Sequence, residues 1–242
     1  MKKVIVFLLT LVLAFSMVAC GGGGDSGDSR NVETEGNDIS AESKPNYKQI
    51  EAVKKEYCIV DGYDGGYDVN YLITAKNPNA DVIAGSQNIS VTARDKNGDV
   101  LGTDDAYLPY IYPGQENTQA SSLTDLDEKP AEVEIELAEV DDNEWFKISE
   151  FEHEDYTPLT TSGVKIRSDK IVGDVVNPND YEIESSSVII AFRDKKGKLV
   201  DFDYTYAEKI PANGKSAFDI YVWDDKPENY DVYVNAQMEL KE

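Results

Sequence analysis

Apolar and polar residues alternate with a period of two at 89–94, 133–137 and 230–234, and the stretch 188–193 has apolar residues at the same phase as 89–94. A period of two places successive side chains on opposite faces, so each stretch predicts a β-strand with one buried and one solvated face. The rows expected to be buried are Ile89, Val91 and Ala93; Val133, Ile135 and Leu137; Val188, Ile190 and Phe192; and Tyr230, Val232 and Val234.

Turn residues separate these stretches. Asp-Lys-Asn-Gly at 95–98 and Asp-Lys-Lys-Gly at 194–197 each follow a predicted strand and end in glycine, which adopts positive φ at little cost, so both predict hairpin turns. Asn-Pro-Asn at 77–79 and at 177–179 predicts a second turn in each half of the chain. Apart from a short helical turn expected around 47–55, no segment has a helical period. Short strands with turns between them predict an all-β fold of the sandwich type.

The same blocks of sequence occur twice. Asn-Pro-Asn at 77–79 returns 100 positions later, Arg-Asp at 94–95 returns 99 positions later, and Lys-Pro at 129–130 returns 97 positions later. Matched blocks in the same order, with little drift in spacing, indicate a tandem duplication. We therefore expect two similar β-sandwich domains, at 46–140 and 143–242.

Each copy also contains a short motif of a known family. Residues 91–95 and 190–194 share an apolar-x-apolar-x-Asp skeleton, and in each copy an Asn-x turn precedes it and a hairpin glycine follows. This order resembles the FxLYD-type domain, an immunoglobulin-like module found in bacterial lipoproteins, often in tandem. Both copies lack the aromatic pair of the family signature. The resemblance implies immunoglobulin-like architecture and no established enzymatic activity.

The N-terminus has the pattern of an export signal. Two lysines precede the uncharged stretch 4–19, which is shorter than the roughly 20 residues that span a membrane and is typical of a secretory signal. Its end, Met17-Val18-Ala19-Cys20, resembles the lipobox of bacterial lipoproteins. The resemblance implies that residues 1–19 are removed as a signal peptide and that Cys20 carries acyl chains of the palmitate type. The alternative is an ordinary secretory signal with an accidental cysteine at its end.

The segment that follows is expected to be a tether. Residues 20–45 are rich in Gly, Ser and acidic residues with almost nothing apolar, which predicts a disordered linker after the lipidated cysteine. More than one acyl chain gives stable anchoring. We therefore expect the protein on the extracytoplasmic side of a cell membrane, at a Gram-positive cell surface.

The net charge limits the classes of binding partner, and the cysteine content limits disulfide and thiol chemistry. With 23 Lys and Arg against 47 Asp and Glu, the chain has a formal net charge of −24, which argues against nucleic acid as a partner. Cys58 is the only cysteine besides Cys20, so an intrachain disulfide is not expected. Because Cys58 lies in the apolar run 57–60, we interpret it as a buried thiol rather than a nucleophile.

Two loops have partial features of a calcium site. Asp61, Asp64 and Asp68 alternate with glycines and could supply oxygen ligands, although a glycine-rich connection with solvated charges explains the same sequence. The segment 95–99 has the opening spacing of a calcium loop, but it lacks the glycine and glutamate that complete one. We expect no cofactor, with the three aspartates as weak metal candidates.

No set of residues predicts an enzyme. His153 is the only histidine, and its acidic surroundings at 152–155 favour a solvated side chain over a catalytic base. Carboxylates are abundant. Glycosidases require one carboxylic acid with a raised pKa and one ionised carboxylate, and nothing in the sequence distinguishes such a pair. Phosphate loops, dinucleotide fingerprints and zinc-ligand sets are absent from the sequence.

Tyrosine is the most abundant aromatic residue, with 15 in the chain. Its flat apolar ring with a polar tip suits contact surfaces as well as strand packing. The function expected is that of a non-catalytic binding or adhesion module for a protein or glycan ligand, and the alternative is a structural or accessory component of a cell-envelope complex. The weak candidates for ligand contacts are Tyr107, Tyr110, Tyr112, Tyr204 and Tyr206.

Overall fold

The computed structural model describes residues 47–63, 65–222 and 229–241. The signal peptide, Cys20 and the tether expected from the sequence lie outside these residues. Among the residues described, strands dominate, and the regular exception is a single 3₁₀ turn, Ile148–Glu150. No helix in this part of the chain is long and apolar enough to cross a membrane.

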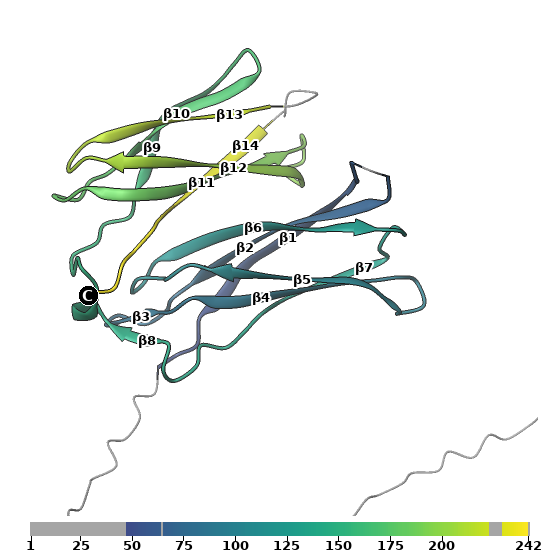
Figure 1. Ribbon diagram of the computed structural model, residues 1–242, viewed down its shortest axis with the longest axis horizontal. Helices are drawn as coiled ribbons and strands as arrows, with labels where there is room; N and C mark the ends of the chain where they lie inside the picture. The colour runs from purple at the N-terminus through teal and green to yellow at the C-terminus, as the bar shows by residue number, and fades with distance from the viewer. Residues whose placement is uncertain (1–46, 64, 223–228, 242) are drawn as a thin grey trace, which may run out of the picture. The chain divides into compact units, whose positions relative to one another are not determined.

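The first domain contains eight strands. Two three-stranded sheets, ordered β1-β2-β6 and β5-β4-β7, enclose one apolar core, and β3 and β8 form a short ladder beside them (Figure 1). The bounds are β1 Glu51–Asp61, β2 Tyr67–Lys76, β3 Val82–Ala84, β4 Gln87–Arg94, β5 Val100–Leu108, β6 Glu116–Leu126, β7 Glu132–Leu137 and β8 Trp145–Lys147.

The second domain repeats this topology without the short ladder. Its sheets are ordered β9-β10-β13 and β12-β11-β14, and a second apolar core lies between them (Figure 1). The bounds are β9 Thr160–Arg167, β10 Lys170–Val176, β11 Ile183–Arg193, β12 Leu199–Ile210, β13 Lys215–Tyr221 and β14 Asn229–Ala236. In the first domain β2 pairs with β6, and in the second domain the corresponding strands β10 and β13 pair, which is immunoglobulin-like pairing in an all-β sandwich.

Most of the sequence pattern is confirmed. Ile89, Val91 and Ala93 are fully buried, and both predicted hairpins form, with Asp95 and Asp194 each accepting two backbone N–H bonds of their turns. Those hydrogen bonds hold the pKa of Asp194 below its ordinary value, the backbone N–H of Lys198 most of all.

Two sequence expectations are wrong. No helical turn forms at 47–55: residues 47–50 have no regular structure and residues 51–55 begin β1, which pairs with β2, so cross-strand pairing overrides the local pattern. The first domain also extends past 140, because β8 at Trp145–Lys147 pairs with β3. The segment expected to open the second domain therefore completes the first.

Asn-Pro-Asn forms a turn and also a buried hydrogen-bonded link between loops, which we call the asparagine staple. Asn177 is 1% exposed, and its Nδ2 donates to the backbone oxygens of Tyr181 (2.7 Å), Ile210 and Pro211 (both 3.2 Å). Its Oδ1 accepts from the backbone N–H of Asn179 at 3.0 Å. The amide therefore ties two loops of the sandwich together.

The first domain repeats this staple. Asn77 is fully buried and donates to the backbone oxygens of Val82 (2.8 Å) and Ile111 (2.9 Å). Asn79 continues it by exchanging two hydrogen bonds with the backbone of Lys48, at 2.8 and 3.0 Å. In each domain the motif therefore also fastens the incoming chain to the sandwich.

The two domains belong to one compact unit, Pro45–Glu242, and share an apolar contact. The outward face of sheet β1-β2-β6 meets the outward face of sheet β12-β11-β14, and we call this contact the inter-domain interface. The face of β11 that the alternation assigned to solvent is buried there. The buried apolar members are Cys58, Leu72 and Ala120 of the first domain and Ile189, Ala191 and Leu199 of the second.

A buried arginine closes one part of the inter-domain interface. The guanidinium of Arg193 donates to both carboxylate oxygens of Glu56, at 2.8 and 2.9 Å, and its Nε donates to Asp231. Lys54 pairs with Glu56 at 2.9 Å and lies 3.3 Å from the hydroxyl of Tyr233. Partial burial raises the pKa of Glu56, but the hydrogen bonds and charges of Arg193 and Lys54 together outweigh it and lower that pKa.

Aromatic packing secures the connection between the domains. Phe151, in the segment after the 3₁₀ turn, is fully buried against Tyr110, Tyr112 and Phe146, with ring centroids 5.1 to 6.0 Å apart. The hydroxyl of Tyr112 donates to the backbone oxygen of His153 at 3.1 Å. The connection is therefore packed into the fold.

Candidate functional site

Cys58 is the first sequence candidate that the structure places. Its thiol is free and buried in the inter-domain interface, and burial raises its pKa to about 12. Because the thiolate is the nucleophile, such a thiol is inert near neutral pH. The interpretation of Cys58 as a buried thiol is confirmed.

The aspartate loop at 61–68 has no described arrangement of metal ligands. Asp64 lies outside the described residues, and the carboxylate of Asp68 accepts the backbone N–H of Asp125 at 3.0 Å. Among the residues that the structure describes, no group of three or more His, Cys, Asp or Glu side chains is placed to hold a metal ion. Asp61 is the last residue of β1, and Asp68 is the second residue of β2.

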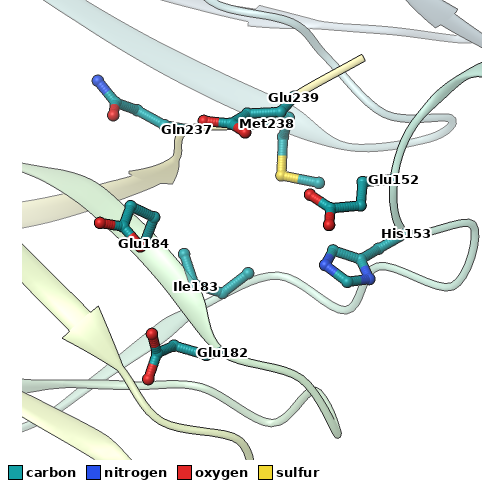
Figure 2. Close-up of a pocket in the computed structure, with 8 residues that line it drawn as sticks. All are labelled: Glu152, His153, Glu182, Ile183, Glu184, Gln237, Met238 and Glu239. Atoms are coloured by element: carbon teal, nitrogen blue, oxygen red, sulfur yellow. The ribbon is translucent and has the colours of Figure 1, made fainter. Parts of the chain in front are cut away.

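His153 is less solvated than its acidic neighbours suggest. His153 is half-exposed, and its ring stacks on Tyr181 with centroids 3.4 Å apart and an interplanar angle of 10°. His153 also lines a cavity of about 420 Å³ that includes Met238 and several glutamates (Figure 2). We call this the acidic cavity.

The carboxylates that line the acidic cavity have similar, exposed environments. Glu152, Glu182, Glu184 and Glu239 come from three segments around it, and all four are exposed to solvent. In Figure 2, Glu152 and Met238 reach toward the middle of the cavity. A glycosidase needs two carboxyls in different environments, one of them desolvated. Four solvated carboxylates do not supply that difference.

The candidate tyrosines divide into two groups. Tyr112 is 4% exposed and Tyr110 packs edge-on against Phe146, so both belong to the aromatic packing at the domain connection and not to a contact surface. Tyr107, Tyr204 and Tyr206 are exposed by 66%, 55% and 51%. Only these three are available for a ligand among the five.

Tyr204 and Tyr206 line a groove where the two domains meet. They lie on one face of β12 with Phe202, and their ring centroids are 6.0 Å apart at an interplanar angle of 86°. Strand β6 of the first domain forms the opposite wall, and the volume is about 380 Å³. We call this the tyrosine groove. Its other lining residues are Gln119, Ala120, Ser121, Ser122, Ser187 and Ile189.

Serine side chains give the tyrosine groove a defined hydrogen-bonding character. Ser122 donates to the side-chain oxygen of Asn70 at 2.6 Å, and Ser121 donates to Asp104 at 3.3 Å. The Ser122 hydroxyl oxygen is therefore left as an acceptor for a ligand, whereas the Ser121 hydroxyl points into the first domain beside Tyr71. Ser187 has the opposite role. Its hydroxyl oxygen accepts a hydrogen bond from the side-chain amide of Asn235 at 3.2 Å, so its hydroxyl proton can be donated to a ligand.

A buried network supports this wall of the groove. Asp104 also accepts from the hydroxyl of Tyr71 at 2.7 Å, and burial raises the pKa of that tyrosine, so the phenol stays protonated as a donor. Asn70 in turn donates to Asp201 of the second domain at 2.7 Å. The polar groups behind the groove are thus held by both domains.

One feature of the sequence indicates part of the tyrosine groove. Phe202, Tyr204 and Tyr206 alternate with period two, which predicts a single aromatic face on one strand. The serines on the opposite wall come from another domain about 80 residues earlier. No local pattern brings the two walls together.

No protein-family model and no curated protein matches the chain. Among solved structures, a crystal structure of red sea bream transglutaminase is similar over 80% of this chain and 30% of that chain, with 10% sequence identity and a TM-score of 0.22. The chain thus spans less than a third of that structure. A likeness at this level carries no argument about activity, so function rests on the geometry of the site.

Proposed function

We propose that this protein is a non-catalytic, membrane-anchored extracytoplasmic lipoprotein that binds glycan chains in the tyrosine groove. The observation that carries the proposal is the pair of adjacent, exposed, mutually perpendicular tyrosine rings facing a wall of hydroxyl groups. Aromatic rings pack on the apolar C–H faces of sugars, while serine and glutamine side chains match sugar hydroxyls. The groove combines both.

The dimensions favour a glycan over a folded protein. A stable protein contact buries about 800 Å² on each partner around an apolar centre. The tyrosine groove is a narrow depression of about 380 Å³ with polar side chains on one wall. Small concave sites with a few placed polar groups are typical of small-molecule ligands.

Removing one groove tyrosine tests this proposal. Tyr206→Ala is expected to weaken binding of the full chain to its best glycan on an array by about tenfold, because a stacking surface is lost. Tyr107→Ala is the matched control, since Tyr107 occupies the same position in the first domain but lies outside the groove. Titration calorimetry with that glycan measures both variants.

Two results would contradict glycan binding at this site. One is an array without any saturable glycan, which would favour the alternative of a structural or accessory envelope component. The other is equal weakening by Tyr107→Ala and Tyr206→Ala, which would place binding elsewhere.

The anchor is tested separately. In a bacterial host, Cys20→Ala is expected to abolish incorporation of labelled palmitate and to shift the protein from the membrane fraction to the medium, because the lipid supplies the membrane affinity. Cys58→Ala, at the only other cysteine, is expected to keep both the label and the membrane location. Full membrane association of the Cys20→Ala variant would refute lipid anchoring.

A further inference from the structure

Each domain leaves one sheet face open. The inter-domain interface uses the outward face of β1-β2-β6 in the first domain and of β12-β11-β14 in the second. By the repeat, the counterparts of these faces are β9-β10-β13 in the second domain and β5-β4-β7 in the first. These two counterparts are not part of the inter-domain interface.

The open face of the second domain is basic, although the chain as a whole is strongly acidic. Lys165, Arg167 and Lys170 line a shallow hollow of about 620 Å³ over β9, β10 and β13, and the two aspartates that also line it, Asp174 and Asp219, each pair with a lysine. Lys170 pairs with Asp219. In the described part of the chain, Lys165 and Arg167 have no ion-pair partner among the bridges found.

The open face of the first domain is acidic. On β7, Ile135 is buried in the core, so the alternating Glu132, Glu134 and Glu136 point outward, and all three are exposed. Asp105 on β5 lies on the same face and is exposed too, with Ser90 of β4 between it and Glu136. The two open faces therefore carry opposite charges.

We propose that the basic β9-β10-β13 face of one molecule docks on the acidic β5-β4-β7 face of a second copy. This head-to-tail contact repeats between molecules the pairing of sheet faces that joins the two domains within one molecule. A heterologous contact of this kind does not close on itself, so it generates linear arrays. The inference is independent of glycan binding.

Residue differences between the two domains determine how polar this contact is. By the repeat register, the interface residues Ile189 and Ala191 correspond to Ser90 and Thr92 on the open acidic face. On the basic face, Ala120 corresponds to Asp219. The inter-domain interface thus has an apolar centre, whereas the contact between copies is polar and reversible.

The net charge of −24 does not prevent this association at physiological ionic strength. Packed sheets lie about 10 Å apart, while the Debye length is about 8 Å at 0.15 M salt. The electrostatic energy of association is therefore determined mainly by the charges on the two facing sheets, because more distant charges are screened by salt.

Carbodiimide cross-linking tests the contact, because the reagent joins amines only to carboxylates that touch them. Full chains labelled with ¹⁴N and ¹⁵N are mixed at 0.15 M salt, cross-linked and analysed by mass spectrometry. We expect isotopically mixed links from Lys165 or Lys170 to Glu134 or Glu136. Such mixed links show that the amine and the carboxylate belong to different molecules.

Charge reversal supplies the second arm of the test. Lys165→Glu with Arg167→Glu is expected to reduce the mixed links at Lys170 by about tenfold, since like charges then face each other. Adding a chain with Glu134→Lys and Glu136→Lys is expected to restore cross-linked dimers.

The control for charge reversal is Lys196→Glu with Lys198→Glu, on an exposed hairpin outside both faces, which should leave the links unchanged. The proposal is overturned if the links are not isotopically mixed or if the reversed pair cross-links normally. It is also overturned if Lys165 and Arg167 instead bind the full chain to anionic vesicles without any link between copies.

Discussion

Asn177→Asp is expected to lower the free energy of unfolding at pH 7 by about 3–5 kcal/mol, the cost of leaving a buried charge uncompensated. The side-chain amide of Asn177 donates to three backbone oxygens, those of Tyr181, Ile210 and Pro211. An isosteric carboxylate would face the same oxygens without a proton to donate. Urea denaturation monitored by tryptophan fluorescence measures the loss.

The pH dependence identifies the cause. Burial would raise the pKa of the introduced carboxyl in the folded state above its ordinary value of about 3.9. The penalty relative to the parent chain should therefore be smallest near pH 3 and grow as the pH rises through that value. Asn143→Asp, at an exposed asparagine, is the matched control and should change stability by less than about 0.5 kcal/mol. A similar small change for Asn177→Asp would refute the staple.

Arg193→Met is expected to cost about 1.5–3 kcal/mol, because it removes the buried guanidinium that binds Glu56 and Asp231, while Lys54 still pairs with Glu56. Arg193 is 5% exposed, and its guanidinium binds Glu56 with two hydrogen bonds across the inter-domain interface. Methionine retains much of the apolar stem. Chemical denaturation measures the change, and a fluorescent pair with one dye in each domain reports whether the domains separate first.

The repeat provides a control for this prediction. Arg94 is the counterpart of Arg193, but its recorded hydrogen bond is a single one to the backbone oxygen of Gly98 at 3.3 Å. Arg94→Met should therefore change stability by less than about 0.5 kcal/mol. Combining Arg193→Met with Glu56→Leu should cost clearly less than the sum of the single changes, because each single change already removes the two hydrogen bonds between these residues. Additive costs would show that the pair is not coupled.

The strand pattern predicted the sandwich because β4 and β7 each have one core face and one solvated face. The same reasoning failed for β11, where Ile189 and Ala191 are buried although the alternation assigned that face to solvent. The run Val188-Ile189-Ile190-Ala191-Phe192 is continuously apolar, which is the pattern of a strand covered on both sides. That signal was present, but it does not say what covers the second face.

The candidate site was less predictable than the fold. Exposed tyrosines on β12 follow from spacing along one strand, whereas their opposite wall on β6 depends on how two domains pack. The burial of Tyr112 depends on the same packing, since its ring contacts Phe151 of the domain connection. Tertiary contacts of this range leave no periodic trace in the sequence.

The inter-domain interface has a consequence for the order in which the chain matures. Synthesis runs from the N-terminus, so β1, β2 and β6 are complete while the strands that cover them are still being made. Leu72 and Cys58 remain uncovered until β11 and β12 arrive, and β14 is the last strand to join that sheet. A chain that stops before β14 therefore exposes apolar side chains and an unpaired edge of β11. Release of β14 from the ribosome is the step that covers this surface and lowers the tendency to aggregate.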